Sequence, residues 1–255
     1  MNILFTICGR AGSKGFKNKN LKKLNGIPLV YYTLSAIRLY MGKYPESNIT
    51  VALNTDSKEL QELVSSQHMV DNVILAERKE SLAGDVAAKV EVIKDTYFQC
   101  RGITEFDVVV DLDITSPMRR LCDVEAAIDN LLADPNCDLV YSVVPARRSP
   151  YFNMVEKKDK YYRKICPSMY TARQQAPVSY ELNASIYAYR PKFLSGTIDR
   201  TILDYNCGIV VMPDYLVLDI DSEEDFEMME MLFEHFAKSD YGLREIRQCL
   251  VNVSV

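Results

Sequence analysis

The chain alternates short apolar segments with amphipathic ones, and this alternation constrains the fold more than any other feature of the sequence. The first segment, 2–8, has the length of a strand, carries no charge and runs into a glycine-rich loop, as a strand buried on both faces of a parallel sheet does. Together with the segments that follow, it predicts an α/β fold with an open, mostly parallel sheet and helices on both faces. Further strands are predicted at 49–53, 73–75, 107–112, 138–144, 185–189, 208–212 and 216–220, and helices at 27–37, 57–64, 85–98, 123–132 and 223–236.

A chain of 255 residues has room for one large domain of this kind, which we expect to occupy residues 1–238. The periodicity weakens at about 145–182, where Arg, Tyr, Lys and Pro are frequent, and we expect a small inserted arm there. The tail, 239–255, gives no clear structural signal.

Composition and charge exclude several classes of protein. A net charge of −5 argues against a general nucleic-acid surface, because such proteins present a broad basic face to phosphates. No stretch approaches the roughly eighteen apolar residues of a membrane span, and the opening run lacks the charged flank of a signal peptide. The seven cysteines are scattered without the spacing of a zinc site. We therefore expect a cytoplasmic protein that binds neither nucleic acid nor membrane.

An unusually basic segment follows the first strand. Residues 10–23 contain six Lys and Arg side chains and no acid, within an otherwise acidic chain. Their three glycine neighbours, spaced GxxGxxG from Gly9, match neither the P-loop nor the dinucleotide fingerprint. Open α/β sheets bind ligands at the carboxyl ends of their strands, where a glycine-rich backbone can close on phosphate oxygens. The segment predicts a polyphosphate site in which Arg10 and Lys14 neutralise charge; the alternative is a tight turn with a solvated basic face.

Two aspartates, Asp219 and Asp221, come at the end of the predicted strand 216–220. Alternation along a strand sends both carboxylates to one face, and such a pair suits Mg²⁺, which takes one or two carboxylates plus phosphate oxygens. The alternative is that Asp221 caps the next helix. Asp113, at the end of another predicted strand, is a candidate for acceptor or metal contact or for capping a turn.

Several motifs in this order resemble the signature of the acylneuraminate cytidylyltransferases, the family of CMP-nonulosonate synthetases. The resemblance spans residues 3 to 235. It rests on Ile7-Cys-Gly-Arg-Ala-Gly-Ser-Lys-Gly15, Lys19-Asn20-Leu21, Asn25-Gly26-Ile27-Pro28-Leu29, Asn54-Thr55-Asp56, Arg78 with Leu82-Ala83-Gly84-Asp85, Thr115-Ser116-Pro117-Met118-Arg119, Arg173-Gln174-Gln175-Ala176-Pro177, Asn183-Ala184-Ser185-Ile186-Tyr187 and Asp219-Ile220-Asp221.

The resemblance implies a Rossmann-like sheet of the nucleotide-diphospho-sugar transferase type, a homodimer joined through the arm, and a role for each matched position. Arg10, Ser13, Lys14 and Lys19 would hold the CTP phosphates and stabilise the leaving pyrophosphate, with Arg10, Lys14, Lys19, Asp219 and Asp221 as the catalytic set. Nucleotide contacts fall on Gly9, Ala11, Gly12, Asn20, Arg78 and Asp85. Contacts to the sugar acid fall on Asp113, Thr115, Ser116, Arg173, Gln174 and Asn183, and Mg²⁺ on Asp219 and Asp221. Arg147 and Arg148 would reach the neighbouring subunit's site, or else form a solvated pair.

Within that family the sequence is most similar to the bacterial CMP-N,N'-diacetyllegionaminic acid synthases. The likeness lies in Leu112-Asp-Ile-Thr-Ser-Pro117, in Pro145-Ala-Arg-Arg-Ser-Pro-Tyr-Phe-Asn153 and in the segment 183–187. The neuraminate enzymes usually carry Gln-Pro where this chain has Asp113-Ile114. We therefore expect a cytidylyltransferase that couples CTP to a nine-carbon sugar acid with release of pyrophosphate.

Other readings remain open. N-acetylneuraminate, pseudaminate and the eight-carbon octulosonate are alternative acceptors, although the octulosonate enzymes lack the motifs at 173–177 and 183–187. A nucleotide-binding regulator without catalytic activity is the alternative from another class.

Overall fold

The predicted first strand is β1 (Asn2–Cys8), an interior strand of the main sheet. The computed structural model describes residues 1–12, 15–84 and 87–251. Within these residues a seven-stranded sheet runs in the order β11-β7-β10-β6-β1-β4-β5. Its other strands are β4 (Asn48–Thr55), β5 (Ile74–Glu77), β6 (Val108–Leu112), β7 (Leu139–Pro145), β10 (Tyr180–Tyr189) and β11 (Cys207–Val211).

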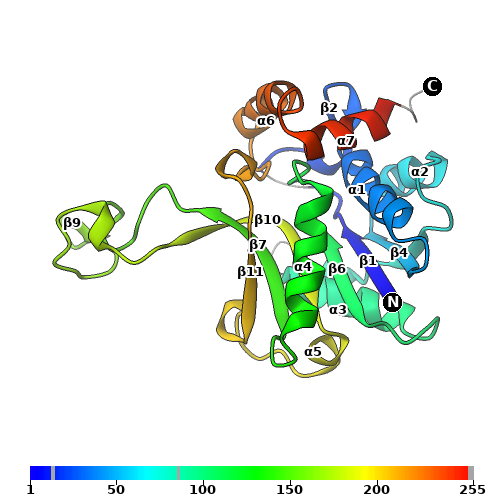
Figure 1. The fold of residues 1–255 in the computed structure, drawn as a ribbon, viewed down its shortest axis with the longest axis horizontal. Coiled ribbons are helices and arrows are strands. Elements are labelled where there is room, and N and C mark those ends of the chain that lie inside the picture. The colour runs from blue at the N-terminus through cyan, green and yellow to red at the C-terminus, as the bar shows by residue number, and fades with distance from the viewer. Residues whose placement is uncertain (13–14, 85–86, 252–255) are drawn as a thin grey trace.

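Helices cover both faces of this sheet (Figure 1). They are α1 (Leu29–Lys43), α2 (Lys58–Ser66), α3 (Lys89–Cys100), α4 (Leu121–Ala133), α5 (Pro191–Ser195), α6 (Glu223–Phe236) and α7 (Tyr241–Val251). Short 3-10 turns lie at Lys19–Leu21, Glu80–Leu82, Arg173–Gln175, Ile202–Asp204 and Asp214–Leu216. No helix among the described residues is long and apolar enough to cross a membrane.

In the seven-stranded sheet the strands pair in parallel except for β10, which is antiparallel to both β6 and β7. The sequence analysis predicted an open, mostly parallel sheet with helices on both sides, and the structure confirms it. Because β1, β4 and β6 run the same way, their carboxyl ends meet at one edge of the sheet. That edge carries the glycine-rich loop.

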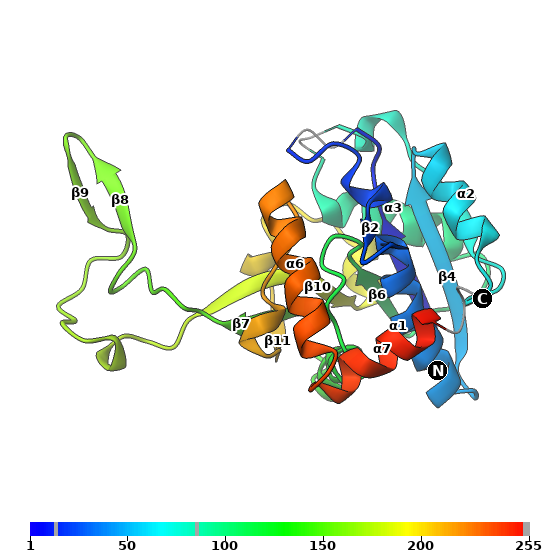
Figure 2. The same cartoon turned by 90° about the horizontal axis from the view of Figure 1, so that it is seen from above.

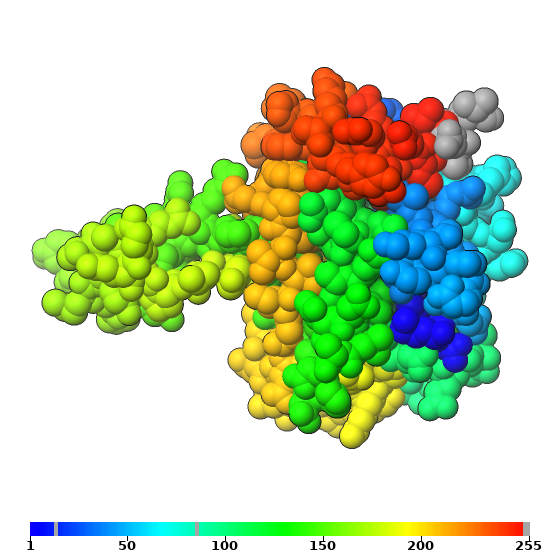
Figure 3. All heavy atoms as spheres, viewed as in Figure 1, coloured from blue at the N-terminus to red at the C-terminus, as the bar shows by residue number. Residues whose placement is uncertain are grey.

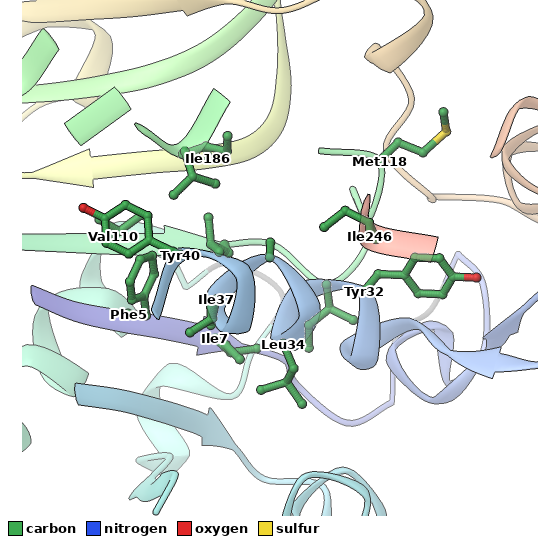
Figure 4. Close-up of a cluster of buried hydrophobic side chains, with 14 of the residues drawn as sticks. Phe5, Ile7, Tyr32, Leu34, Ile37, Tyr40, Val110, Met118, Ile186 and Ile246 are labelled. Carbon is green, nitrogen blue, oxygen red and sulfur yellow. The ribbon is translucent and has the colours of Figure 1, made fainter. Parts of the chain in front are cut away.

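The larger core lies between the sheet and helices α1, α4 and α7. Figure 4 shows side chains of α1, among them Ile37 and Tyr40, beside Phe5 of β1 and Val110 of β6. Tyr40 meets the Phe5 ring edge to face, with ring centroids 5.5 Å apart. A smaller core on the other face packs α3 and α5 against the same strands. The central strands are thus apolar on both faces, as their uninterrupted runs predicted.

Two local predictions and one alternative are wrong. The predicted strand 216–220 is absent: Leu216 belongs to a 3-10 turn at Asp214–Leu216, and the Ile220 N–H donates to the Thr115 carbonyl, 3.0 Å away, rather than to a neighbouring strand. The predicted helix 85–98 begins at Lys89, since Ala88 is extended, while Asp85 lies outside the described residues. The helix α6 is capped by Ser222, whose hydroxyl accepts from the Asp225 N–H, and not by Asp221.

The arm is formed by the ends of β7 and β10, which leave the body of the molecule together (Figure 2). They lead to a hairpin of β8 (Val155–Lys158) and β9 (Tyr161–Lys164), which projects away from the sheet in Figure 3. A second small hairpin, β2 (Lys23–Leu24) and β3 (Ile27–Pro28), follows the basic segment. Within the C-terminal tail, where no structure was predicted, residues Tyr241–Val251 form α7, which packs on α1.

A buried guanidinium joins three elements at the edge of the sheet where the parallel strands end. Arg119 is fully buried; its Nε donates to Ser185 Oγ of β10 at 3.0 Å and its NH1 to Thr33 Oγ1 of α1 at 3.1 Å. Its NH2 donates to the carbonyls of Ser116, at 2.7 Å, and of Asp113. Burial lowers the pKa of Arg119 to about 10, although the nearby Asp113 carboxylate acts to raise it. The Arg119 guanidinium therefore stays charged at neutral pH.

Replacing this side chain should leave several buried acceptors without a donor. We expect Arg119→Met to lower the free energy of unfolding by about 3 kcal/mol in urea titrations monitored by circular dichroism. Arg101→Met is the matched control, because Arg101 is exposed and stacks over the Phe98 ring at 4.4 Å; it should cost less than about 1 kcal/mol. Equal losses in the two variants would contradict the role given to Arg119.

Candidate active site

A polar cavity of about 200 Å³ opens where the carboxyl ends of β1 and β6 meet. Its walls come from segments far apart in the chain: the loop after β1, the turn 78–84, the start of α3, the loop after β6, and the segment before α6. The lining residues include Cys8, Arg10, Lys19, Asn20, Arg78, Gly84, Lys89, Asp113, Thr115 and Asp219. The structure therefore brings together predicted nucleotide, acceptor and metal positions in one cavity.

The loop after β1 is held by its backbone and leaves its polar groups facing the cavity. The Gly9 N–H donates to the Asn54 carbonyl at 3.1 Å, and the Ala11 N–H donates to Asp56 Oδ1 at 2.7 Å. A Cβ at Gly9 would lie 2.8 Å from the Ile114 side chain and 2.9 Å from that of Leu60, so a larger residue would require these buried side chains to shift. Asn20 Nδ2 donates to the Arg10 carbonyl at 3.0 Å.

The cationic groups of the cavity come from opposite sides. Lys19 Nζ contacts the Ile220 carbonyl and Asp221 Oδ1, each at 2.9 Å, and so ties the basic segment to the segment before α6. Arg78 donates from Nε and NH2 to the Leu82 carbonyl, and burial lowers the pKa of Arg78. Ser13, Lys14 and Asp85 lie outside the described residues, and their roles stay predictions. Gly12 has φ +64°, which suits a turn built on glycine.

A lysine lies between two carboxylates at the floor of the cavity. Lys89, the first residue of α3, places its Nζ 2.8 Å from Asp111 Oδ2 and in direct contact with Asp113 Oδ2. Asp111 is fully buried in β6, and its other oxygen accepts from Thr6 Oγ1 at 2.8 Å. Although burial opposes the charged ammonium, the two carboxylates raise the pKa of Lys89 well above its usual value. The Lys89 ammonium therefore stays charged at neutral pH.

Asp113 is fixed as an anion by its neighbours. Its Oδ1 accepts from the Thr115 N–H at 2.9 Å and from Thr115 Oγ1 at 2.8 Å, an arrangement typical of a capped turn. Burial alone would raise the pKa of Asp113, but Lys89 and the Thr115 donors outweigh it and lower the pKa to about 2. Asp113 both caps a turn and lines the cavity, so the two readings of its sequence position are compatible.

The two aspartates proposed for a metal differ in their surroundings. Asp219 lines the cavity, and its buried Oδ1 has no hydrogen-bond partner among the described residues. Burial, with Asp113 second, raises the pKa of Asp219. The Asp221 side chain is 77% exposed and pairs with Lys19. Within residues 1–12, 15–84 and 87–251 no group of three or more His, Cys, Asp or Glu side chains is gathered for a metal.

The residues predicted to contact the sugar acid lie in separate parts of the structure. Thr115 lines the cavity, whereas Ser116 and Asn183 are buried within the fold. Asn183 Oδ1 accepts from Ser142 Oγ at 2.6 Å, and its Nδ2 donates to the Leu216 carbonyl at 2.9 Å. Arg173 and Gln174 lie at a separate cavity of about 290 Å³ at the base of the arm, where Arg173 NH2 donates to the Ala146 carbonyl at 2.7 Å. The single chain does not join these two residues to the main cavity.

Sequence reasoning missed Lys89 and Asp111. A signal for Asp111 was present, because a carboxylate inside the apolar run 108–112 requires a buried partner in a parallel sheet. Lys89 could not be named as that partner, since the two residues are brought together only by the packing of α3 on the sheet. Cys8 also lines the cavity, but burial, reinforced by Asp111, raises the pKa of its thiol well above the usual value, which leaves it unreactive.

The fold and the site together define a class: an α/β nucleotidyltransferase with its ligand cavity at the carboxyl ends of parallel strands. Two solved structures share the fold. One is CMP:2-keto-3-deoxy-manno-octonic acid synthetase complexed with CTP, with TM-score 0.68 and 15% identity over 92% of this chain and all of that one. The other is 4-diphosphocytidyl-2C-methyl-D-erythritol synthase from Anaerococcus prevotii, with TM-score 0.56 and 13% identity over 91% and 98%.

Sequence comparison gives the family. Residues 4–235 match the Cytidylyltransferase family model, and the chain belongs to that family. It is 34% identical to post-translational flagellin modification protein B of Campylobacter coli, over 91% of this chain and 95% of that protein. It is also 34% identical to CMP-N,N'-diacetyllegionaminic acid synthase of Campylobacter jejuni, over 90% and 94%. An N-acylneuraminate cytidylyltransferase of Streptococcus agalactiae is 24% identical, over 96% of this chain and 55% of that protein.

The lowered pKa of Asp113 predicts an acid dependence of stability. Its folded-state pKa of about 2 lies below the roughly 3.9 of an unfolded chain, so its contribution is present above pH 4 and is lost as the pH falls toward 2. The stability difference between the native protein and Asp113→Asn should therefore shrink by about 1 kcal/mol between pH 6 and pH 3, measured by urea unfolding. In Lys89→Met this part of the acid dependence should vanish. A difference that stays constant with pH would refute the ion pair.

Proposed function

We propose that this protein transfers CMP from CTP to a nonulosonic acid, with N,N'-diacetyllegionaminate as the favoured acceptor, and releases pyrophosphate. The observation that carries the proposal is the cavity itself, in which cations from the glycine-rich loop face carboxylates across the carboxyl ends of β1 and β6. Membership of the cytidylyltransferase family supports the reaction class.

The reaction needs positioning and charge neutralisation rather than a covalent intermediate. The anomeric hydroxyl oxygen of the sugar acid attacks the α-phosphorus of CTP in line. The new P–O bond forms as the bond to the β-phosphate oxygen breaks, and pyrophosphate leaves while the hydroxyl proton is released. Arg10 and Lys19 line the cavity, and we assign to them the stabilisation of the charge that develops on the leaving group, because charge-assisted contacts to phosphate are stronger than neutral ones. Ser13 and Lys14 are proposed for the same role from the sequence.

Asp219 and Asp221 are the residues that would hold Mg²⁺. The unpaired buried oxygen of Asp219 and the exposed carboxylate of Asp221 suit a cation that shares its ligands with phosphates. A bound Mg²⁺ would neutralise phosphate charge and polarise the attacking hydroxyl. Lys19 holds Asp221 through their ion pair, so the basic segment also orients the proposed metal ligand.

The acceptor is proposed from the relatives and from one position. Two relatives carry the name CMP-N,N'-diacetyllegionaminic acid synthase, at 34% and 29% identity. Asp113 stands where neuraminate enzymes usually carry Gln. Its ion pair with Lys89 holds its carboxylate in place, so the acceptor would meet an anion there rather than an amide. N-acetylneuraminate and pseudaminate are the alternative acceptors.

The deciding experiment measures pyrophosphate release from CTP and Mg²⁺ with each sugar acid as sole acceptor. We expect diacetyllegionaminate to give a kcat/KM at least tenfold above N-acetylneuraminate, pseudaminate and the octulosonate, since a mispaired buried polar group costs at least about 1.4 kcal/mol. Preference for another of these sugars would change the acceptor and keep the reaction. No release with any acceptor, from folded protein that still binds CTP, would support the non-catalytic regulator.

The same assay tests the proposed metal ligands. Asp221→Asn should reduce kcat about 100-fold at saturating Mg²⁺, since it removes a charge that acts on the phosphates. Asp129→Asn is the control, because Asp129 is exposed on α4 and does not line the cavity; it should keep normal turnover. Full activity of Asp221→Asn would refute the assignment.

We further propose that two copies of the chain associate through the arm. Its exposed apolar side chains include Tyr162, Met169 and Val178, and Met169 is 94% exposed, which is typical of an unfilled interaction surface. Arg147, at the base of the arm, pairs with Asp214 through an NH2–Oδ2 contact of 2.6 Å. Arg148 lies near Arg173 and Gln174 around the same small cavity, and we propose that this cavity is completed by the second copy.

Sedimentation velocity tests the association. The native chain should sediment as a dimer at micromolar concentration, and the double variant Met169→Glu with Val178→Glu should weaken association at least tenfold, because it buries charges at an apolar interface. Ile103→Glu is the matched control, since Ile103 is an exposed apolar residue outside the arm. A native monomer, or equal effects of both changes, would contradict the proposal.

A further inference from the structure

Two segments that are far apart in the chain carry carboxylates of the cavity. Segment 113–120 follows β6 and begins with Asp113, and segment 214–221 leads to α6 and contains Asp219. Both carboxylates line the cavity, and they repel each other when both are ionised. The two segments therefore need contacts that hold them at a fixed spacing. The reaction depends on that spacing, because groups for the phosphates and for the acceptor come from both.

One contact between these segments lies close to the cavity. The Ile220 N–H donates to the Thr115 carbonyl at 3.0 Å. A single hydrogen bond between two loops fixes a distance and leaves rotation about that point open. A reactive site must be held within narrow limits of both distance and angle, so a second fixed point, away from the first, is required.

Asp240, the residue before α7, supplies that second point. Its Oδ2 accepts from Tyr215 Oη at 2.5 Å and from Arg120 NH1 at 3.4 Å, so one carboxylate oxygen joins both segments. Its Oδ1 accepts from the Leu243 N–H at 2.9 Å and caps the first turn of α7. The Asp240 side chain is 11% exposed, and hydrogen bonds to a charged group are strong in such a setting.

Both partners of this carboxylate are also held from other sides. The Tyr215 ring stacks on Phe236 at the end of α6, with ring centroids 3.9 Å apart. Arg120 donates from Nε and NH2 to the two oxygens of Asp123, at 3.0 and 2.6 Å, which fixes it at the start of α4. A Cβ at Gly242 would lie 2.7 Å from the Arg120 Cβ, so α7 packs closely on the Arg120 stem. The contact is a packed junction, unlike a solvated surface ion pair.

We propose that Asp240 is a positioning residue for the transfer of CMP. Through Tyr215 and Arg120 it sets the spacing and orientation of segments 113–120 and 214–221, whose carboxylates face the phosphates and the acceptor. This inference rests on the proposed function and deepens it. It gives α7 a part in the reaction although none of residues 241–251 lines the cavity at the sheet edge, and although the family match ends at residue 235.

The smallest change that tests the junction is the loss of one hydroxyl. Tyr215→Phe keeps the stack on Phe236, and Asp240→Asn keeps an oxygen that can cap α7. Tyr44→Phe is the matched control, because it also removes a tyrosine hydroxyl that donates to a carboxylate, Glu125 Oε1 at 2.9 Å, outside the junction. Each variant is assayed for pyrophosphate release with CTP, Mg²⁺ and diacetyllegionaminate. Mn²⁺ binding in the presence of CTP, by electron paramagnetic resonance, and thermal unfolding are measured alongside.

We expect Tyr215→Phe and Asp240→Asn each to lower kcat at least tenfold at saturating Mg²⁺ and to leave the KM for CTP within threefold, because a misplaced segment weakens the transition state more than nucleotide binding. The dissociation constant for Mn²⁺ should rise at least fivefold, since Asp219 and Asp221 lose their fixed orientation. Tyr44→Phe should change none of these values more than twofold. The double variant should lose no more than about threefold beyond the larger single loss, because both changes remove one junction.

Turnover and Mn²⁺ binding within twofold of the native values in either folded single variant would overturn the proposal, as would losses that multiply in the double variant. Equal losses in Tyr44→Phe would assign them to a general loosening of the fold and would overturn it too. If Asp240→Asn does not fold, Tyr215→Phe decides by the same two measurements. Native protein that binds CTP and Mn²⁺ but releases no pyrophosphate would instead refute the proposed function, and the Mn²⁺ titrations of the variants would still test the junction.

Discussion

The charge cluster of Lys89, Asp111 and Asp113 is the interaction on which the site depends. A carboxylate in the middle strand of a sheet is costly to bury, and Asp111 is fully buried. The ammonium of Lys89 compensates that charge from the first turn of α3, where the helix dipole alone would disfavour a cation. The start of α3 is thereby fixed against β6. That fixed point forms the floor of the cavity at the carboxyl ends of β1 and β6.

A second buried cation stabilises the opposite wall. Arg119 holds the carbonyls that follow Asp113 and ties them to α1 and β10, so the turn that presents Asp113 and Thr115 is held from behind. The two cations differ in exposure. Lys89 is partly exposed in the cavity, whereas Arg119 is fully buried and acts only through the groups that it positions. A rigid turn next to a glycine-rich loop is the preorganisation that nucleotide transfer requires.

The layout of the fold could be predicted from local patterns, and the parts that could not were decided by tertiary contacts. Uninterrupted apolar runs identified β1, β6 and β7, because strands buried on both faces need no alternation. The segment 216–220 has the same composition, but its backbone bonds to the loop at Thr115 instead of to a neighbouring strand. Its two aspartates therefore do not share a strand face, although Asp219 still lines the cavity and Asp221 meets Lys19. The partner of Asp111 was out of reach for the same reason, since only the packing of α3 brings Lys89 to β6.

The reversed direction of β10 decides where the arm emerges. Because β10 runs against its neighbours, its first residues lie beside the last residues of β7, at the edge where the parallel strands end. The segment between them leaves the body and returns to the same edge of the sheet. Its length therefore does not affect the pairing register of any other strand. Residues can be added to or removed from the hairpin without shifting the sheet or the cavity. The arm can in this sense change in length and sequence while the geometry at the sheet edge stays constant.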